Sequence, residues 1–394
     1  MHLFYYFLII YLLLKPYYIF ASGSMQICDI FLALSFALFL IYNKKNIYSF
    51  DNLKEQINKN KYYLFFLILV LIIQSIYFIT YTTTDFLIYL LYYIYDFLAI
   101  IVFGYAIKNE KFLSKMNIII KLNLIIQLLI YALGYGRWYG LTRYMGTFND
   151  PNQLAYFILL NYCFIYILNQ KYNKNILPYL AISVFLIFES MSTGILLGIS
   201  VFLILDVINI MRTLPSFIKR NSKKIMAAFF IILFVCSIGL AYSLYDANFL
   251  NKLQNSYLNI KIFDRVSEKV NKIDSKNGNL LQERGYDRIK YYPQYIIYGA
   301  GEGNFKRWQL AYHQQEFHAT LPSILFNYGI LSLFLVCMWI YNNIKKLPFK
   351  YIIVYIALLA ESFTLVNSRQ ALFWVIFILG NYLYSVEGGK INNE

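Results

Sequence analysis

The chain has 394 residues, of which 60% are hydrophobic and only 14% are charged. Because an average soluble domain has about 25% charged residues, this composition excludes an ordinary soluble protein and predicts an all-α polytopic membrane protein. The net charge of +15 does not indicate nucleic-acid binding, because nearly all the excess Lys and Arg lies in short loops between apolar runs. The four cysteines fall inside apolar runs without CxxC pairing, so we expect no metal site and no cofactor.

Apolar runs of about 20 residues, the length that crosses a bilayer, recur along the whole chain. We predict twelve transmembrane helices, at 3–20, 25–42, 62–81, 85–107, 116–135, 152–169, 176–190, 193–211, 225–244, 320–341, 351–366 and 369–386. The seventh and eleventh are short, and we expect them to be half-buried, tilted or re-entrant. The chain is thereby divided into helices one to nine (1–244), a long loop (245–319), and helices ten to twelve with a tail (320–394).

Basic residues alternate between successive loops. Loops 43–61, 108–115, 170–175, 212–224 and 342–350 hold eighteen lysines and arginines, whereas the alternate short loops hold Arg137 and Arg143, with Arg369 at the edge of the last span. Short loops rich in Lys and Arg remain in the cytoplasm. The alternation therefore predicts that both termini are cytoplasmic and that the long loop is extracytoplasmic.

The long loop has two different halves. Residues 248–279 are rich in Asn, Lys and Asp, with apolar residues at helical intervals, which predicts one or two amphipathic helices on the membrane surface or capping the bundle. Residues 283–319 carry Arg284, Arg288 and Arg307, a GAGEG turn, and the histidines His313 and His318. This polar segment is where we expect the chemistry to occur.

Arginines are frequent on the predicted outward side. Their planar guanidinium groups bind phosphate in a bidentate manner, which lysine cannot do. The alternative is that each arginine pairs with an outward acid or with lipid headgroups. The six arginines are Arg137, Arg143, Arg284, Arg288, Arg307 and Arg369.

Four other features have both a functional and a structural interpretation. Asn149 and Asp150 precede Pro151, so this helix start is either an anion site or simply a capped helix. The GAGEG turn lacks the lysine and spacing of a P-loop, so a structural turn is the default. His318 suits proton transfer near neutral pH, although a lone interfacial histidine is more often simply a satisfied polar residue. We expect the membrane carboxylate Glu361 to approach Arg369.

Three segments resemble the bacterial O-antigen and capsular polysaccharide polymerases (Wzy type), which share a superfamily with the O-antigen ligases. They are RGYDRI…YPQYIIYGAGEGNF (284–305), HATLPSILFNYGILS (318–332), and Arg143 with Gly146, Phe148, Pro151 and Asn152. A Ser-Arg pair is frequent in this family at a turn between two spans, but the corresponding SMSTG (190–194) lacks the arginine. We expect Arg137 or Arg369 to substitute for it.

The resemblance implies a membrane glycosyltransferase in the bacterial cytoplasmic (inner) membrane, working without a metal. It would join oligosaccharide repeat units carried on polyprenyl (undecaprenyl) diphosphate, with a chain-length regulator and a flippase as partners. His318 and Arg284 would be catalytic, and the substrate-binding residues would be Arg288, Arg143, Arg137, Arg307, Arg369, Asn152 and Glu302. The alternatives are ligase-type transfer of finished glycan to another acceptor and transport of lipid-linked sugars.

Overall fold

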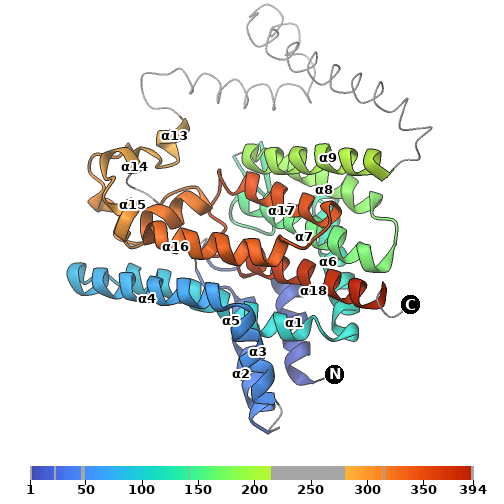
Figure 1. Cartoon of the computed structure of the whole chain (residues 1–394). Coiled ribbons are helices and arrows are strands. Elements are labelled where there is room, and N and C mark those ends of the chain that lie inside the picture. Colours follow the sequence, from blue (N-terminus) through green and yellow to red (C-terminus); the bar gives the residue numbers. More distant parts are fainter. Residues whose placement is uncertain are drawn as a thin grey trace, which may run out of the picture.

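A computed structural model describes residues 2–21, 24–45, 49–140, 142–213, 280–312, 314 and 316–391. These residues form a helical bundle with one small antiparallel hairpin, made of β1 (Arg137–Tyr139) and β2 (Arg143–Gly146) (Figure 1). The expected span 225–244, the amphipathic segment 248–279 and His313 lie outside the described residues.

Twelve helices build the bundle in the described ranges. They are α1 (Leu3–Leu14), α2 (Ile27–Lys45), α3 (Ser49–Lys59), α4 (Lys61–Tyr81), α5 (Asp85–Ala106), α6 (Glu110–Ala132), α7 (Pro151–Tyr172), α8 (Leu177–Ser190), α9 (Thr193–Thr213), α16 (Thr320–Ile344), α17 (Phe349–Glu361) and α18 (Ala371–Ile391). Short helical segments shape the second half of the long loop. They are α13 (Leu280–Glu283), α14 (Asp287–Tyr291), α15 (Tyr295–Tyr298) and the 3-10 turn η1 (Phe305–Arg307).

Six of these helices are long and apolar enough to cross a membrane, namely α4, α5, α6, α7, α9 and α16. The chain is therefore an all-α membrane protein. Shorter apolar helices occupy most of the expected runs at 3–20, 25–42, 176–190 and 369–386. The total of twelve spans remains a prediction.

Several helix boundaries differ from the expected ones, and one helix was not expected. The first run was expected to be helical to residue 20, but α1 ends at Leu14. Pro16 lacks a backbone N–H and cannot continue the helical hydrogen bonding. The loop 43–61 was expected to be a connection, yet it contains the amphipathic helix α3. Glu55 stabilises this helix by pairing with Lys59 one turn later, at 2.7 Å, and with Lys108 at 2.7 Å.

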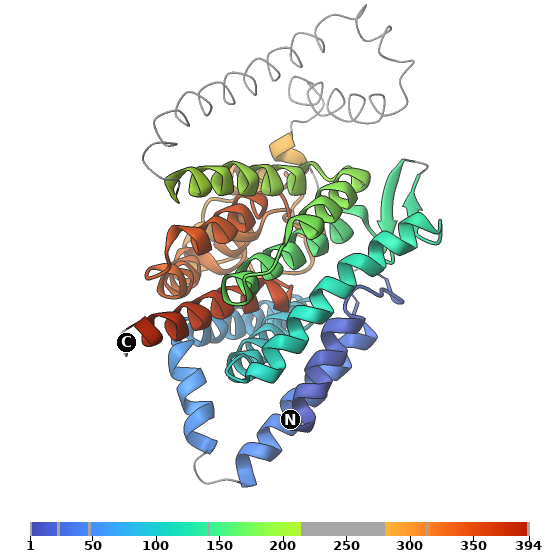
Figure 2. The ribbon, with the colours of Figure 1, turned by 90° about the vertical axis from the view of Figure 1, so that its right-hand side faces the viewer.

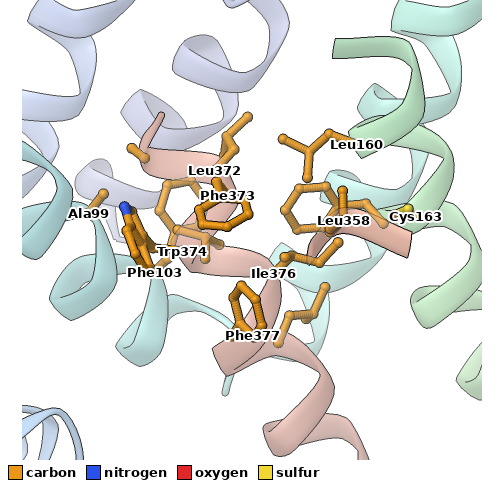
Figure 3. Packing of buried hydrophobic residues seen from close by; sticks show 14 of the residues in the cluster. Ala99, Phe103, Leu160, Cys163, Leu358, Leu372, Phe373, Trp374, Ile376 and Phe377 are labelled. Carbon is orange, nitrogen blue, oxygen red and sulfur yellow. The ribbon is translucent and has the colours of Figure 1, made fainter. Parts of the chain in front are cut away.

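The core lies where α7 and α18 cross the bundle. Helix α7 is buried along nearly its whole length, and α18 packs against α5, α7 and α16. Figure 3 shows Phe373 and Trp374 of α18 between Phe103 of α5 and Leu160 of α7. Figure 2 shows α9 above α17 and the hairpin near the end of α6. A helix that is apolar on all sides is expected at such a central position.

The second half of the long loop is attached to α16 by close backbone contact. The amides of Ala300 and Gly301 donate to the carbonyls of Phe326 and Asn327 over 3.0 and 2.8 Å. At the same place α16 is kinked at Gly329, where φ is 79°. A Cβ at Gly329 would lie 2.5 Å from the carbonyl oxygen of Ile297, so only glycine allows this approach. Segments α13, α14 and α15 gather at this end of α16 (Figure 1).

Candidate functional site

The centre of the candidate site is Arg369, in the turn between α17 and α18. Its Nη2 donates to Glu302 Oε1 over 2.7 Å, and its Nη1 donates to Glu316 Oε2 over 2.8 Å. The guanidinium also lies over the ring of Tyr89, 4.5 Å from its centroid. In this structure Arg369 joins the two carboxylates of the long loop to the bundle, and its role in substrate binding stays a prediction.

Glu302 is almost completely buried, at 1% exposure, and both of its carboxylate oxygens are engaged. Oε1 accepts from Arg369, and Oε2 accepts from the hydroxyls of Tyr93 and Tyr328 over 3.2 and 3.1 Å. The side-chain amide of Gln74 in α4 forms two hydrogen bonds with the backbone of Glu302. Gln74 Oε1 accepts from the Glu302 N–H, and Gln74 Nε2 donates to the Glu302 carbonyl, each over 3.0 Å. Glu302 was also expected to contact substrate, yet its surroundings make it an anchor for the GAGEG turn.

Four of the five backbone amides of the GAGEG turn (299–303) are likewise occupied, and the Gly299 N–H donates to the carbonyl of Tyr295. Ala300 and Gly301 donate to carbonyls of α16, as described above, and Glu302 donates to Gln74. Backbone N–H groups that already have carbonyl partners do not form a phosphate cradle. The turn is therefore a rigid support that places Glu302 against Arg369.

His318 stands at the edge of the loop, just before α16. Its backbone N–H donates to the carbonyl of Arg284 over 3.0 Å, and its Nδ1 lies 4.0 Å from Glu316 Oε1. Burial lowers the pKa of the His318 imidazole below its ordinary value of 6.5, Glu316 opposes this, and Arg284, Arg369 and Arg288 lower the pKa further. The imidazole is therefore mainly neutral at pH 7 and able to accept a proton.

Arg284, whose backbone carbonyl accepts from the His318 N–H, lines an open groove. The groove has a volume of about 480 Å³ and is bordered by Thr193, Gly194, Leu281, Arg284, Tyr286, Phe363 and Thr364. Arg284 Nη1 donates to the carbonyl of Thr364, which holds the guanidinium at the wall of the groove. Burial lowers the pKa of Arg284, although a guanidinium stays charged at neutral pH. One cation among apolar walls suits a ligand with an anionic group and a hydrocarbon part.

Arg288 and Arg307 belong to an aromatic cluster around Trp308. Arg288 is fully buried, and its guanidinium lies 6.0 Å from the Trp308 ring centroid. Arg307 lies 4.2 Å from the same ring and 5.0 Å from that of Tyr77, and it donates to the carbonyl of Gly301 over 2.5 Å. Burial lowers the pKa of Arg288 to about 10. Both arginines pack the loop onto the bundle, and their predicted role in binding substrate stays a prediction.

Arg143 reaches the turn that lacks its own arginine. Its Nε donates to the carbonyl of Ser190 over 3.1 Å, and its Nη2 donates to Asn152 Oδ1 over 2.9 Å. Ser192 donates to the same Asn152 oxygen over 2.9 Å. We expected Arg137 or Arg369 at the SMSTG turn, so that expectation was wrong. Arg143 lies close to the SMSTG turn because it belongs to β2, which packs against α7 and α8.

Two further expectations differ from the structure. Arg137 is exposed on β1 and donates to the carbonyl of Tyr18 over 3.2 Å and to the Asn149 side chain, so it holds the hairpin to the end of the first apolar run. Glu361 was expected near Arg369, but its Oε2 accepts from Asn367 over 2.5 Å. The partners of Arg369 come from the loop instead.

The start of α7 is a capped helix. Asp150 Oδ1 accepts from the N–H groups of Asn152 and Gln153 over 2.7 and 3.2 Å. A side-chain carboxylate thus takes the place that an anion would occupy. Asn152 nevertheless contributes to the site through its contacts with Arg143 and Ser192.

Sequence reasoning missed Glu316 and Gln74. The sequence could have pointed to Glu316, because it is the one acidic residue between Glu302 and Glu361 and lies two residues before His318. Gln74 is an amide in the middle of a strongly apolar run, where a polar side chain needs a partner. Neither signal identifies the partner.

The described residues contain no group of three or more His, Cys, Asp or Glu side chains that could hold a metal ion. No protein-family model matches the chain, and no curated protein shows significant similarity to it. The function is therefore argued from the geometry of the site and from the motifs.

Proposed function

We propose that this protein joins oligosaccharide repeat units carried on polyprenyl diphosphate into a polysaccharide, at the outer face of the bacterial cytoplasmic membrane. The observation that carries this proposal is the position of His318. A histidine with a lowered pKa lies beside Glu316, and its backbone is bonded to Arg284, whose side chain lines the groove. A base whose backbone is bonded to the arginine of an amphipathic groove suits transfer from an anionic lipid carrier.

The chemistry of the groove supports a lipid-linked donor. Arg284 supplies the positive charge, and Phe363, which is 53% exposed, supplies apolar surface at the same groove. The alternation of basic loops predicts that this side lies outside the cytoplasm, where a donor has to carry its own activating group. A diphosphate linked to a long hydrocarbon chain meets both conditions.

The reaction is a displacement at the anomeric carbon of the donor. The acceptor sugar hydroxyl attacks that carbon while the bond to the diphosphate oxygen breaks. His318 takes the hydroxyl proton, and the lipid diphosphate leaves with the bonding electrons. Arg284 stabilises the negative charge that develops on the leaving group.

Transfer of finished glycan to a different acceptor would use the same groups, so a ligase is the second candidate. The two functions differ in their products. In cells, loss of a polymerase leaves single repeat units, whereas loss of a ligase leaves long chains on the lipid carrier.

The decisive experiment incubates the purified protein with a defined lipid-linked repeat unit and separates the products by size. A polymerase gives a ladder of lipid-linked oligomers. We expect His318→Ala and Arg284→Ala to abolish the ladder, and Lys306→Ala, which removes an exposed cation from the same loop, to retain it. An unchanged ladder from His318→Ala at normal protein levels would show that the catalytic assignment is wrong.

A further inference from the structure

Glu316 lies between two basic side chains of the candidate site. Its Oε2 accepts a hydrogen bond from Arg369 Nη1 over 2.8 Å, and its Oε1 lies 4.0 Å from His318 Nδ1. The first contact is a charge-assisted hydrogen bond, whereas the second is too long for a hydrogen bond and is electrostatic. One carboxylate thus connects Arg369 to the imidazole.

Arg369 is itself fixed from the buried side. Its other terminal nitrogen donates to Glu302 over 2.7 Å, and Glu302 is held in turn by the hydroxyls of Tyr93 and Tyr328. Glu302 is 1% exposed, whereas the side chain of Glu316 is 34% exposed. The buried member of this chain of contacts is therefore Glu302 in the bundle, and the more exposed member, Glu316, faces His318.

The charges around His318 make Glu316 distinctive. Arg284 from the α13–α14 connection, Arg288 from α14 and Arg369 from the α17–α18 turn all act on the imidazole as cations, and Glu316 acts on it as an anion. A carboxylate at Nδ1 stabilises the tautomer that carries its proton on that nitrogen and leaves the lone pair on Nε2. The contact can shorten to a hydrogen bond when substrate is bound, as catalytic contacts often do.

We propose that Glu316 is a positioning residue for His318 and that Arg369, anchored by Glu302, fixes Glu316 in turn. This arrangement directs Nε2 of the imidazole toward the sugar hydroxyl. The inference rests on the proposed function for the identity of the hydroxyl, but the coupling of Glu316 to His318 can be measured without substrate.

The test follows chemical modification of the purified full-length protein in detergent. Diethyl pyrocarbonate acylates neutral imidazole, so the rate of modification of His318 against pH, read by peptide mass spectrometry, gives the midpoint of its titration. Modification of the two other histidines, His2 and His313, serves as an internal control for the activity of the reagent at each pH. Because Glu316→Gln removes the negative charge facing the ring, it should lower the His318 midpoint by about one pH unit.

Two variants serve as controls. Glu316→Asp keeps the charge and should stay close to the wild-type midpoint. Asp85→Asn removes a different outward carboxylate, which accepts from the Asn304 amide over 3.2 Å, and should leave His318 unchanged. In the oligomer assay, Glu316→Gln should lower kcat about tenfold or more with KM nearly unchanged, and Glu316→Asp should recover part of the loss.

The outcomes separate the two proposals. If Glu316→Gln leaves the His318 titration midpoint unchanged, as Asp85→Asn is expected to do, the positioning role is overturned. This result does not depend on which product the enzyme forms. A shifted midpoint with a tenfold lower kcat supports it. A shifted midpoint with normal kcat overturns the positioning role in catalysis. A shifted midpoint, together with a normal ladder from His318→Ala, overturns the proposed use of His318 as the base.

Discussion

Arg369 Nη2 and Glu302 Oε1 lie 2.7 Å apart and join the long loop to the turn between α17 and α18. The pair is largely buried, with side-chain exposures of 14% and 1%. Desolvation makes such a pair costly to break, because loss of one partner leaves the other charge buried. Loop and bundle are therefore coupled at the point where the candidate base is held.

Replacement of Arg369 should destabilise the protein strongly. Arg369→Gln leaves Glu302 without its cation, which typically costs about 3–5 kcal/mol for a buried pair. We expect a clearly lower midpoint of thermal unfolding in detergent. Lys306→Gln, which removes an exposed cation from the same loop, should change the midpoint little. Equal midpoints for the two variants would show that the ion pair does not hold the loop.

The kink at Gly329 should tolerate no side chain. Gly329→Ala adds both backbone strain at φ 79° and a Cβ 2.5 Å from the Ile297 carbonyl oxygen. Gly134→Ala imposes a similar strain at φ 74° but meets no described atom within 4 Å. Gly134→Ala should cost about 1–2 kcal/mol and Gly329→Ala clearly more. Unfolding in detergent compares the two, and equal losses would mean that the close contact is unimportant.

Activity should depend on pH through His318. Since the lowered pKa keeps the imidazole neutral to lower pH, the rate should fall only below the ordinary histidine value of 6.5, as protonation removes the base. Initial rates of oligomer formation at saturating lipid-linked donor, measured across this range, give the acid limb. A limb centred above 6.5 would contradict the role assigned to His318.

Arg143 and Asn152 should act as a unit. Arg143 bonds to Asn152 and to the carbonyl of Ser190, and the turn that follows supplies Thr193 and Gly194 to the groove. Arg143→Ala and Asn152→Ala should each raise the KM for the lipid-linked donor. The double variant should lose less than the sum, with a coupling of about 0.5–3 kcal/mol. Additive losses would show that the two residues act independently.

Features set by local sequence could be predicted well. The apolar runs locate most of the bundle helices, since a span requires a stretch of side chains that lipid or the core can accept. The cap of α7 by Asp150 before Pro151 follows from residues within one turn. The end of α1 was misjudged because the apolar run continues past Pro16 to residue 20 although the helix does not. Helix α3 was missed because it is a short, charged amphipathic segment between two long apolar runs.

The candidate site was predicted as a set of residues but not as a set of pairs. Local sequence was enough to predict the membrane class, most of the helices and the polar segment around His318, because hydrophobic periodicity and capping act over a few residues. The pairing of Arg369 with Glu302 and Glu316, which are 67 and 53 positions away, and of Arg143 with Ser190, 47 positions away, depends on how the helices pack. Such pairs form where helix packing brings buried charges together, and the need to neutralise a buried charge does not specify which distant residue does so.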